Sequence, residues 1–311
     1  MRVFITGASG FLGGRIFEYL KRKKIEVIIA SRSKKIFKGN KFKKINWNSN
    51  KNLEKLCKNI DVVINCAGYD VHKSKIKSKT FLVNSKRPYQ LYKAAQNAGV
   101  SFFIFLSTAH VYNNNLVGNV NEKTKTTTNK IYGLSKLDGE KKLIRYKKKH
   151  TKLLILRPSN LFGYPINKKV KCWKLLINSL IRDLVVYNKT TILSKRNSYR
   201  NYASIEGFCS FIYLIIQNYF IKKKKLPTII NYCSEYNLNL TEVIRILKER
   251  FDRLKINKNL KIKYKNKFLK KEKKLFYKSI YSRKLKFHND KFFNKEVSNL
   301  ILYCKSNFIN Y

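Results

Sequence analysis

Short apolar segments alternate with amphipathic segments along the first half of this chain of 311 residues. Apolar segments cover residues 3–5, 25–31, 61–68 and 101–112, and most of them end in small or hydroxyl-bearing residues. Short continuous apolar runs are typical of strands that are buried on both faces, and helices between such strands make them parallel. The pattern therefore predicts an α/β fold with a doubly wound parallel sheet.

The first fourteen residues, MRVFITGASGFLGG, join an apolar run to a glycine-rich turn and an amphipathic segment. Gly7 permits a sharp turn, Gly10 lets backbone amides approach a pyrophosphate, and Gly13 lets the next helix pack closely on the strand. The amides and partial positive charge at the start of that helix would face the phosphates. This order of elements predicts a Rossmann-type dinucleotide site. The loop residues assigned to it are Gly7, Ser9, Gly10, Phe11, Leu12 and Gly13.

The second apolar segment ends in Ser31 and Arg32, with no acidic residue at the position that reads the adenosine ribose. An acidic side chain there accepts a hydrogen bond from the 2′-hydroxyl of NAD and would repel a 2′-phosphate, whereas Arg32 can pair with one. We therefore predict NADP as the cofactor. NAD is the alternative, because a basic residue carries less weight in so lysine-rich a chain.

The next two apolar segments supply further residues to the predicted cofactor cleft. Asn65, Ala67 and Gly68 end the segment 61–68 and would line the cleft at the carboxyl edge of a parallel sheet. Ser107 lies where the segment 101–112 changes from apolar to hydroxyl-bearing residues. We assign Ser107 to the same cleft.

Tyr132 and Lys136 lie four residues apart in a predicted helix within residues 129–149, which places both side chains on one face. A nearby ammonium and a positive nicotinamide ring would favour phenolate over phenol and let Tyr132 exchange a proton with a substrate hydroxyl. Lys136 can also hold the nicotinamide ribose. Thr108, at the end of the preceding strand, could hydrogen-bond the same substrate oxygen. Tyr132 and Lys136 are thus assigned to both catalysis and cofactor binding.

The charge balance is strongly basic, with 69 Lys and Arg against 17 Asp and Glu and a formal net charge of +52. Such a surface attracts phosphate in general. However, the excess is mostly Lys and is spread along the chain among Asn, Ile, Phe and Tyr, as a bias toward AT-rich codons would produce. A dedicated nucleic-acid surface concentrates basic residues on one face. We therefore expect no nucleic-acid partner.

Cysteine usage and hydropathy bear on location and metal content. The six cysteines show no C-x-x-C pairing and no nearby histidines, so we expect reduced thiols, no metal site and a cytoplasmic protein. The longest apolar stretch, residues 208–221, is too short to span a bilayer and predicts a buried helix and no membrane partner. No charged leader precedes the first strand, so a secretory signal is not expected.

Together these motifs resemble the extended short-chain dehydrogenases/reductases, specifically the NAD-dependent epimerase/dehydratase group that acts on nucleotide sugars. The resemblance rests on TGASGFLG at 6–13, DVVINCAG at 61–68, VN at 83–84, STAHVY at 107–112, YGLSK at 132–136, LRPSNLFG at 156–163, RNYASIEG at 200–207 and INYCSEYNLNLTEV at 230–243. A weaker echo of the family's closing segment is SRKLKF at 282–287.

The resemblance implies roles for residues outside the cofactor loop. The phenol, the ammonium and the Thr108 hydroxyl would be the catalytic trio, and Asn84 resembles the helix asparagine that supports the lysine through water. Asn160 and Arg200 resemble the residues that hold the sugar nucleotide and its diphosphate. The chemistry of Arg200 agrees, because a guanidinium offers bidentate donors to phosphate. Arg157 is interpreted as structural.

Ala109 and His110 bear on the reaction. In the family's 4,6-dehydratases an acidic pair or a single Glu follows the hydroxyl residue, and a methyl at Ala109 cannot protonate a leaving hydroxyl, which argues against that reaction. Strand alternation would place His110 on the same side as Thr108, where a neutral imidazole could abstract an α-proton. His110 is therefore a candidate catalytic residue. We prefer a hydrogen-bonding or packing role for it, because simple 4-epimerases and 4-ketosugar reductases need no second base.

Two reactions remain, and the resemblance implies an enzyme that prepares sugars for surface polysaccharides. A 4-epimerase removes hydride from C4, turns the ketosugar and returns the hydride to C4, and it keeps NAD bound throughout. A 4-ketosugar reductase uses NADPH once and releases it. Ser31 and Arg32 favour the reductase slightly. The alternative from another class is a non-catalytic Rossmann protein that senses NADP or binds RNA. An intact set of Thr108, Tyr132 and Lys136 argues against that alternative.

The predicted domains are a dinucleotide-binding domain, a returning segment and a smaller, mostly helical substrate lobe. The dinucleotide-binding domain covers residues 1–164, and the returning segment 200–225 packs back on it. The substrate lobe covers residues 165–199 and 226–311. Thr241 is the predicted N-cap of a helix over 242–251. The lysine-rich residues 255–278 are compatible with a strand plus loop or with a partly ordered excursion. A homodimer through the helices near Asn84 and Tyr132 is implied by the resemblance.

Overall fold

The computed structural model describes residues 1–31, 41–113, 116–146, 150–192, 198–256, 259–265, 274–285, 287 and 290–309. The chain divides into two compact units. The first unit consists of Met1–Asn115, Glu122–Pro158 and Ile212–Asn231, and the second of Leu116–Asn121, Ser159–Phe211 and Tyr232–Tyr311. The domain boundaries at 164, 200 and 225 remain predictions from the sequence.

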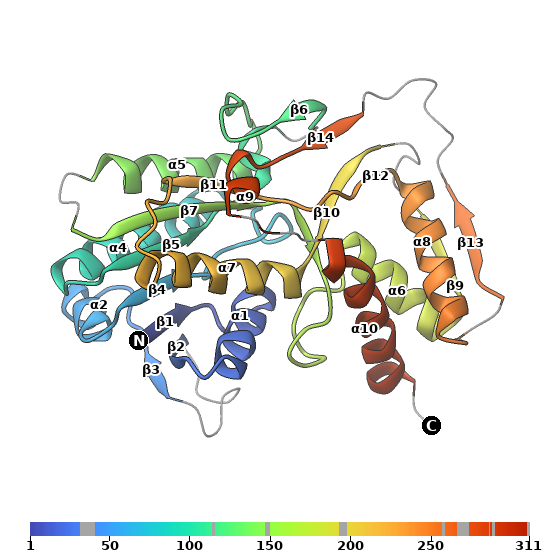
Figure 1. Ribbon diagram of the computed structural model, residues 1–311, viewed down its shortest axis with the longest axis horizontal. Helices are drawn as coiled ribbons and strands as arrows, with labels where there is room; N and C mark the ends of the chain where they lie inside the picture. The colour runs from blue at the N-terminus through green and yellow to red at the C-terminus, as the bar shows by residue number, and fades with distance from the viewer. Residues whose placement is uncertain are drawn as a thin grey trace. The chain divides into compact units, whose positions relative to one another are not determined.

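Seven strands of the described chain form the sheet of the first unit, in the order β11-β7-β5-β4-β1-β2-β3 (Figure 1). The strands are β1 (Arg2–Thr6), β2 (Glu26–Ser31), β3 (Phe42–Lys44), β4 (Val62–Asn65), β5 (Phe102–Leu106), β7 (Lys152–Pro158) and β11 (Ile229–Tyr232). All pairings from β7 to β3 are parallel. The strand order reverses between β1 and β4, and ligands of such sheets bind at this switch point. The predicted parallel α/β fold is confirmed.

Helices cover both faces of this sheet, because successive strand residues point to opposite sides. On one face Phe103 belongs to a buried cluster with Leu53, Leu91 and Leu143. These side chains come from β5, α2 (Asn50–Cys57), α4 (Arg87–Asn97) and α5 (Ile131–Arg145). On the other face Phe102 stacks on Tyr219 of α7 (Ile205–Phe220), with ring centroids 4.6 Å apart. Helix α1 (Phe11–Arg22) lies beside α7, where Tyr19 contacts Tyr213.

The predicted helix around Asn84 is a continuous run of three segments. These are α3 (Lys77–Phe81), the π-helical turn η1 (Leu82–Lys86) and α4. A π-helical turn adds a residue to the helix and often occurs at functional sites. Asn84 lies in this turn and is completely buried.

Helix α7 confirms the buried helix predicted from the apolar stretch 208–221. Phe208, Phe211, Ile212, Ile215 and Ile216 are buried along it. In the described parts of the chain, no helix combines the length and the apolar character needed to cross a membrane.

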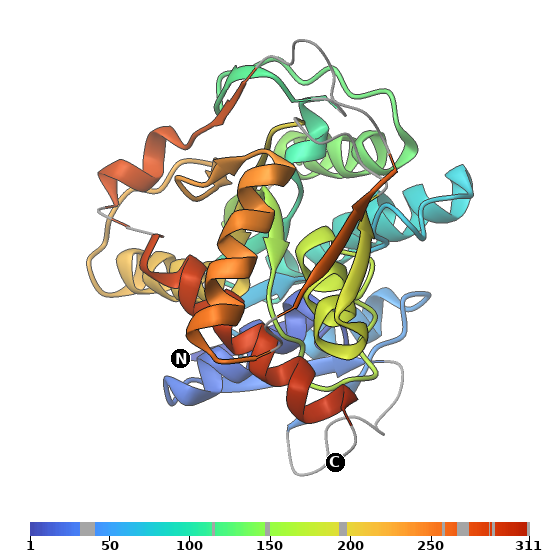
Figure 2. The ribbon, with the colours of Figure 1, turned by 90° about the vertical axis from the view of Figure 1, so that its right-hand side faces the viewer.

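The second unit packs helices against small sheets. Its helices are α6 (Leu176–Tyr187), α8 (Leu240–Arg253), α9 (Ile280–Lys284) and α10 (Asp290–Phe308). Its strands are β6 (Gly118–Val120), β8 (Asn160–Phe162), β9 (Lys189–Ile192), β10 (Arg200–Ser204), β12 (Asn237–Leu238), β13 (Lys261–Tyr264) and β14 (Leu275–Tyr277). Helices α6, α8 and α10 share one buried apolar cluster, and α8 and α10 are seen together in Figure 2.

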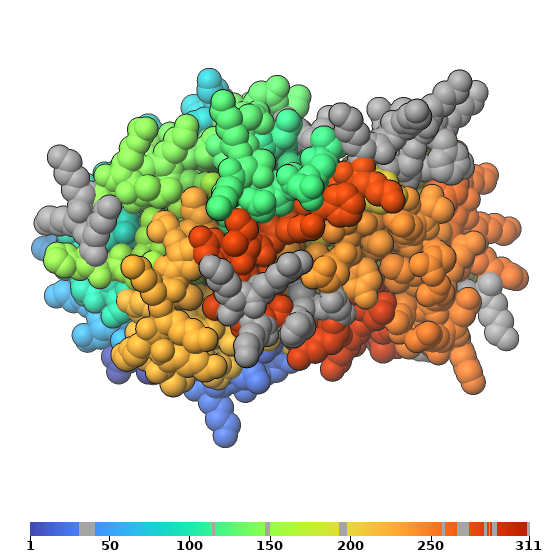
Figure 3. Space-filling model, turned by 45° about the horizontal axis from the view of Figure 1, so that its top comes forward, coloured from blue at the N-terminus to red at the C-terminus, as the bar shows by residue number. Residues whose placement is uncertain are grey.

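Segments far apart in sequence pair within the second unit. Strand β13 runs parallel to β9, and β14 runs parallel to β6. Atoms of β14 lie beside those of β6 in Figure 3. The described parts of residues 255–278 therefore include two short strands, and residues 257–258 and 266–273 lie outside the described chain.

The N-cap of α8 differs from the prediction. Thr241 lies inside the helix, and the cap is Asn239. Its side chain accepts a hydrogen bond from the Glu242 amide, and the Glu242 carboxylate accepts one from the Asn239 amide. This reciprocal capping box satisfies two backbone amides at once. A cap at Thr241 could not form one, because the residue three positions later is Ile244, which has no hydrogen-bonding side chain.

Candidate active site

The loop after β1 has the close contacts that require glycine. Gly7 has φ +73°, and a Cβ on it would lie 2.6 Å from the Ala67 amide nitrogen. A Cβ on Gly13 would lie 2.4 Å from the Gly7 carbonyl oxygen. The loop therefore presses against the end of β4 on one side and against the first turn of α1 on the other. Its shape depends on the absence of side chains at these two positions.

The start of α1 suits an anionic group. Gly10 is the N-cap of α1 and provides no side-chain cap for the first amides of the helix. The first turn contains no acidic residue. At the adjacent strand end the buried Nδ2 of Asn65 has no hydrogen-bond partner in the described structure. A helix start without a side-chain cap, glycines at the close contacts of the loop and an unpaired side-chain amide at the switch point all fit a dinucleotide.

Polar contacts join β1 to β4 beside this loop. Thr6 Oγ1 donates to Asn65 Oδ1 at 3.3 Å, and the Ala67 amide donates to Thr6 Oγ1 at 3.4 Å. The structure thus brings Asn65 and Ala67 to the glycine loop, as the sequence predicts for parallel strand ends. Ser31 ends β2, and Arg32 lies outside the described residues, so its predicted role remains a prediction.

Asn84 connects the segment after β4 to helix α5. Its Oδ1 accepts from the Tyr69 amide at 2.7 Å, and its Nδ2 donates to Ser135 Oγ at 3.0 Å. A Cβ on Gly68 would lie 3.0 Å from Asn84 Oδ1 and 3.1 Å from Lys136 Nζ. Gly68, Asn84 and Lys136 therefore meet at one point, although the sequence separates them widely.

Lys136 is buried and its ammonium is held by the backbone. Its side chain is 6% exposed, and Nζ donates to the Leu106 carbonyl at 2.8 Å. Burial lowers the pKa of Lys136 to about 8. The lysine thus ties α5 to the end of β5, and less work is needed to deprotonate it than to deprotonate an exposed lysine.

Tyr132 lies one helical turn before Lys136 and contacts the end of β5 through Thr108. Burial raises the pKa of Tyr132 to about 12, and a hydrogen bond with Thr108 acts in the opposite direction. The pKa of the phenol is therefore raised rather than lowered, contrary to the effect expected of the neighbouring ammonium. The reason is that desolvation of the phenolate outweighs the favourable contacts.

His110 lies beside Tyr132, but the predicted reason is wrong. Strand β5 ends at Leu106, and residues Ala109–Val111 form a 3-10 turn, η2, so strand alternation does not apply. Thr108 caps this turn, its Oγ1 accepting from the His110 amide at 3.2 Å. The imidazole packs edge to face against the Tyr132 ring, with centroids 5.8 Å apart.

Ser107 hydrogen-bonds a buried carboxylate of α5, and its assignment to the cofactor remains a prediction. Its hydroxyl donates to Oε1 of Glu140, a carboxylate that is 1% exposed. Arg157 pairs with the same carboxylate. Sequence reasoning missed Glu140, although one signal was available: it is an acidic residue one turn after Lys136, on the helix face that carries Tyr132 and Lys136.

The predicted substrate residues belong to the second unit. Asn160 begins β8 and donates from Nδ2 to the Asn201 carbonyl at 2.9 Å. Arg200 begins β10 and is exposed. Strands β8 and β10 are parallel, with Asn160 opposite Tyr202. Their assignment to substrate remains a prediction. Across the described residues, no three His, Cys, Asp or Glu side chains gather as a metal ion would require.

Comparison with known proteins agrees with this architecture. Among solved structures, UDP-glucose 4-epimerase from Thermotoga maritima has a TM-score of 0.82 at 15% identity and covers 99% of this chain and 100% of its own. UDP-N-acetylglucosamine 4-epimerase from Bacillus cereus has a TM-score of 0.79 at 20% identity, with 98% and 99% covered. MoeE5 in complex with UDP-glucose and NAD has a TM-score of 0.79 at 17% identity, with 99% and 100% covered. These likenesses show the fold.

Sequence comparison identifies the family. A dTDP-D-glucose 4,6-dehydratase from Dictyostelium discoideum is 26% identical over 277 residues, which cover 78% of this chain and 61% of that protein. The chain thus spans about six tenths of the length of this curated relative. The sequence profile described as the NAD dependent epimerase/dehydratase family matches residues 3–232. This chain belongs to the NAD-dependent epimerase/dehydratase family.

Proposed function

We propose that this protein transfers a hydride at a carbon of a nucleotide-activated sugar, as an NAD(P)-dependent 4-ketosugar reductase or 4-epimerase. The observation that carries the proposal is that Thr108, Tyr132 and Lys136 meet at the edge of the sheet that also bears the glycine loop. Tyr132 would exchange a proton with the sugar hydroxyl, and Thr108 would hydrogen-bond the same oxygen. When bound, the nicotinamide would donate or accept the hydride.

The proposed cofactor is NADP, held by the amides at the start of α1 and by Lys136 at the nicotinamide ribose. The support is Arg32, which can pair with a 2′-phosphate, together with the lack of an acidic ribose reader. Separate titrations with NADH and NADPH test this choice. NADPH should bind more tightly, and Arg32→Asp should reverse the preference, whereas Lys34→Asp changes the charge equally and should not. Tighter binding of NADH by the unmodified protein would reverse the assignment to NAD.

The proposed substrate is a sugar linked to a nucleoside diphosphate. Asn160 and Arg200 would hold it, because the exposed guanidinium of Arg200 offers two parallel donors to a phosphate. Arg200→Lys keeps the charge but loses the bidentate geometry, so it should raise KM for the sugar nucleotide and leave cofactor binding unchanged.

The proposal separates this protein from the 4,6-dehydratases, one of which is 26% identical to it. Ala109 carries only a methyl group where elimination needs an acid. His110 would pack against Tyr132 and hydrogen-bond, with a role as second base as the alternative. A second base would incorporate deuterium from heavy water beside the keto carbon, and His110→Ala would abolish this. Absence of uptake in the unmodified protein would exclude the second-base role.

The decisive test is a screen of UDP-, GDP- and dTDP-sugars with and without added cofactor, with products separated by chromatography. A reductase should consume NADPH with a 4-ketosugar and show no turnover without it. A 4-epimerase should interconvert two sugars without net cofactor consumption. Conversion of none of these sugars under either condition would overturn the proposed function.

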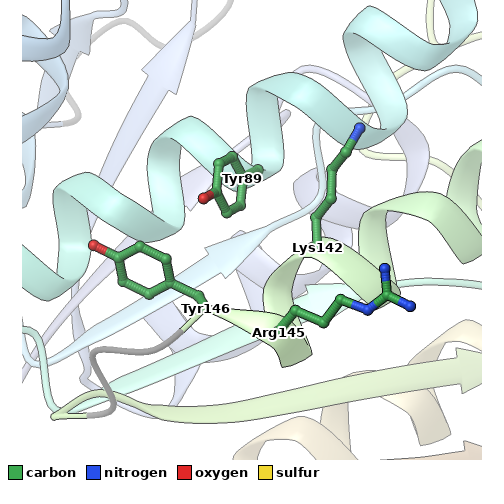
Figure 4. A pocket seen from close by; sticks show the side chains of 4 residues that line it. All are labelled: Tyr89, Lys142, Arg145 and Tyr146. Carbon is green, nitrogen blue, oxygen red and sulfur yellow. The ribbon is translucent and has the colours of Figure 1, made fainter.

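We also propose that the enzyme is a cytoplasmic homodimer that serves surface polysaccharide synthesis. Support for the dimer comes from the surface of the helices that carry Asn84 and Tyr132, where Leu82 and Ile144 are 40% and 41% exposed. The same helices border a pocket of about 390 Å³. The residues that line this pocket (Figure 4) are Tyr89, Lys142, Arg145 and Tyr146.

Light scattering after size exclusion tests the dimer. Burying apolar side chains between two copies would favour association, and a charge placed there would oppose it. Leu82→Glu or Ile144→Glu should therefore give monomers. Tyr187→Glu, at a 61% exposed apolar residue of the second unit, is the matched control and should leave the dimer intact. A monomeric unmodified protein would contradict the proposal.

A further inference from the structure

A buried ion pair lies next to the candidate catalytic residues. Glu140 is 1% exposed and Arg157 is 4% exposed. Arg157 donates from Nη2 to Glu140 Oε2 at 2.5 Å and from Nε to Oε1 at 3.0 Å. The contact is thus bidentate and fixes the relative orientation of both side chains. A buried ion pair is weak support for stability, because desolvation of the charges offsets their attraction.

Glu140 connects the two elements that carry the catalytic trio. It lies on α5, one turn after Lys136, and its Oε1 also accepts a hydrogen bond from Ser107, the neighbour of Thr108. Nearby, Lys136 donates to the carbonyl of Leu106. The end of β5 is therefore held to α5 by two side chains from the same helical face.

Arg157 holds the other end of the same segment. Its guanidinium lies over the ring of Tyr112, 4.8 Å from the centroid. The Tyr112 hydroxyl donates to Asn231 Oδ1 at 2.7 Å. Ser107 and Tyr112 flank the segment that carries Thr108 and His110, so the ion pair anchors this segment on both sides. Strand β7 carries Arg157 and is paired with β5 in the sheet, so the backbone of Arg157 is held in place.

We propose that Glu140 and Arg157 are positioning residues that hold the segment Thr108–His110 against Tyr132. In catalysis this role rests on the proposed function, but the placement of the segment does not. The carboxylate also favours the charged form of Lys136, since Glu140 acts to raise the pKa that burial lowers. The pairing of β5 in the sheet does not fix the positions of Thr108 and His110, because the 3-10 turn and its cap lie beyond the last residue of β5. Side-chain contacts must therefore hold them against α5.

The first test uses Glu140→Gln, which keeps the shape of the side chain and an acceptor for Ser107 but removes the charge. We expect kcat to fall by about ten- to a hundredfold, with KM for the sugar nucleotide within about threefold, because misplacement of reacting groups affects the chemical step more than binding. The pKa of Lys136, followed by NMR of labelled lysine, should fall. An unchanged kcat together with an unchanged Lys136 pKa would overturn the proposal.

A paired apolar variant separates positioning from stability. Glu140→Leu combined with Arg157→Met removes both charges at similar volume, and such replacements often preserve folding. We expect a folded protein whose turnover stays as low as that of Glu140→Gln. If the double variant regains the kcat of the unmodified protein, the pair serves stability and the proposal is wrong.

NMR of His110 supplies a readout that needs no substrate. The chain contains only four histidines, and His110→Ala assigns the signal. The ring of Tyr132 shifts the His110 proton resonances as long as the two rings remain in contact, so we expect this shift to collapse in the paired apolar variant. A shift retained in the folded variant would overturn the proposal. The variant could lose the shift while the unmodified protein converts no sugar. That result would support the positioning role and overturn only the proposed function.

Glu296→Gln is the matched control. Glu296 is equally buried, at 1% exposure, and accepts from the backbone amides of Tyr164 and Glu206 in the second unit. The same chemical change there should reduce stability without moving the His110 signals. An equal movement of those signals in both variants would indicate a general loss of packing and would contradict a positioning role for Glu140.

Discussion

The glycine loop after β1 and the candidate catalytic residues near the end of β5 occupy the same edge of one sheet, yet they are built by different means. The loop is shaped by backbone contacts, in which Gly7 and Gly13 leave no room for a Cβ. The candidate catalytic region is shaped by buried side chains, with Lys136 held by a carbonyl and Glu140 held by Arg157. A region of the first kind fails when an atom is added, and a region of the second kind fails when a partner is removed.

Tyr132→Phe should separate the two regions most strongly. The phenyl ring can retain its packing against His110 but cannot exchange a proton, so we expect kcat to fall by about 10³-fold. Cofactor affinity, which depends mainly on the loop, should stay within about threefold, measured by fluorescence titration with NADPH. Unchanged turnover of every sugar nucleotide would mean that the assigned chemistry is wrong.

Gly13→Ala should produce the opposite pattern. Its Cβ would lie 2.4 Å from the Gly7 carbonyl oxygen, so α1 must move away from the loop. We expect the free energy of unfolding to fall by about 1–3 kcal/mol and cofactor affinity to fall with it. Gly10→Ala is the graded control, because its Cβ would lie 3.3 Å from the same oxygen, and its losses should be smaller. If Gly10→Ala and Gly13→Ala lost equal stability in denaturant melts and equal cofactor affinity in titrations, steric clash with the Gly7 carbonyl would not explain the effect.

The pH dependence of stability should report the buried lysine. Burial lowers the pKa of Lys136 from 10.5 to about 8, so between these values the unfolded chain binds more protons than the folded one. Stability from this group therefore rises with pH, by about 2 kcal/mol between pH 8 and pH 10. Tyr132 acts in the other direction above pH 10, because its folded pKa is raised to about 12.

Comparison with Lys136→Met isolates this contribution. The methionine cannot titrate, so the difference in the free energy of unfolding between the two proteins should change steadily from pH 8 to pH 10 in urea melts. A constant difference across this range would show that the ammonium of Lys136 is not desolvated in the folded protein. Gly13→Ala is the control, because it neither adds nor removes a titrating group. Its difference in the free energy of unfolding from the unmodified protein should stay constant from pH 8 to pH 10.

Asp138→Asn should have the smallest effect on stability and turnover. It tests whether the candidate catalytic region extends to the face of α5 that carries Asp138. Asp138 pairs with Lys142 at 2.7 Å and accepts from Ser85 at 2.5 Å, but both charged side chains are about one third exposed. Solvent screening leaves such pairs worth less than about 1 kcal/mol. Thermal melts should shift only slightly and kcat should not change. A large loss of turnover would extend the catalytic region to this face of the helix.

The sequence already predicted the parts of the site that depend on neighbouring residues. The order of strand, glycine turn and helix follows from short-range sterics around Gly7 and Gly13. The spacing of Tyr132 and Lys136 follows from the periodicity of a helix, which α5 confirms. The parallel arrangement of β1 and β4 brings Asn65 to the loop, as the alternation of strands and helices implies.

Other features needed the tertiary structure. The sequence pattern places His110 by strand alternation, but the strand ends at Leu106 and a 3-10 turn brings the imidazole to Tyr132. Asn239, rather than Thr241, caps α8, because the partner of the cap lies at Glu242. In each case the backbone leaves regular geometry near the end of an element, where periodicity no longer predicts the direction of a side chain.

The sequence by itself thus determined the alternation of strands and helices, the glycine loop and the spacing of the phenol and the amine, because those features follow from patterns within short stretches of the chain. Only the tertiary structure decided that Ser107 bonds Glu140, that Arg157 neutralises this carboxylate, and that burial raises the pKa of Tyr132. Desolvation and charge pairing depend on everything that surrounds a group in space, and those surroundings come from parts of the chain that are distant in sequence.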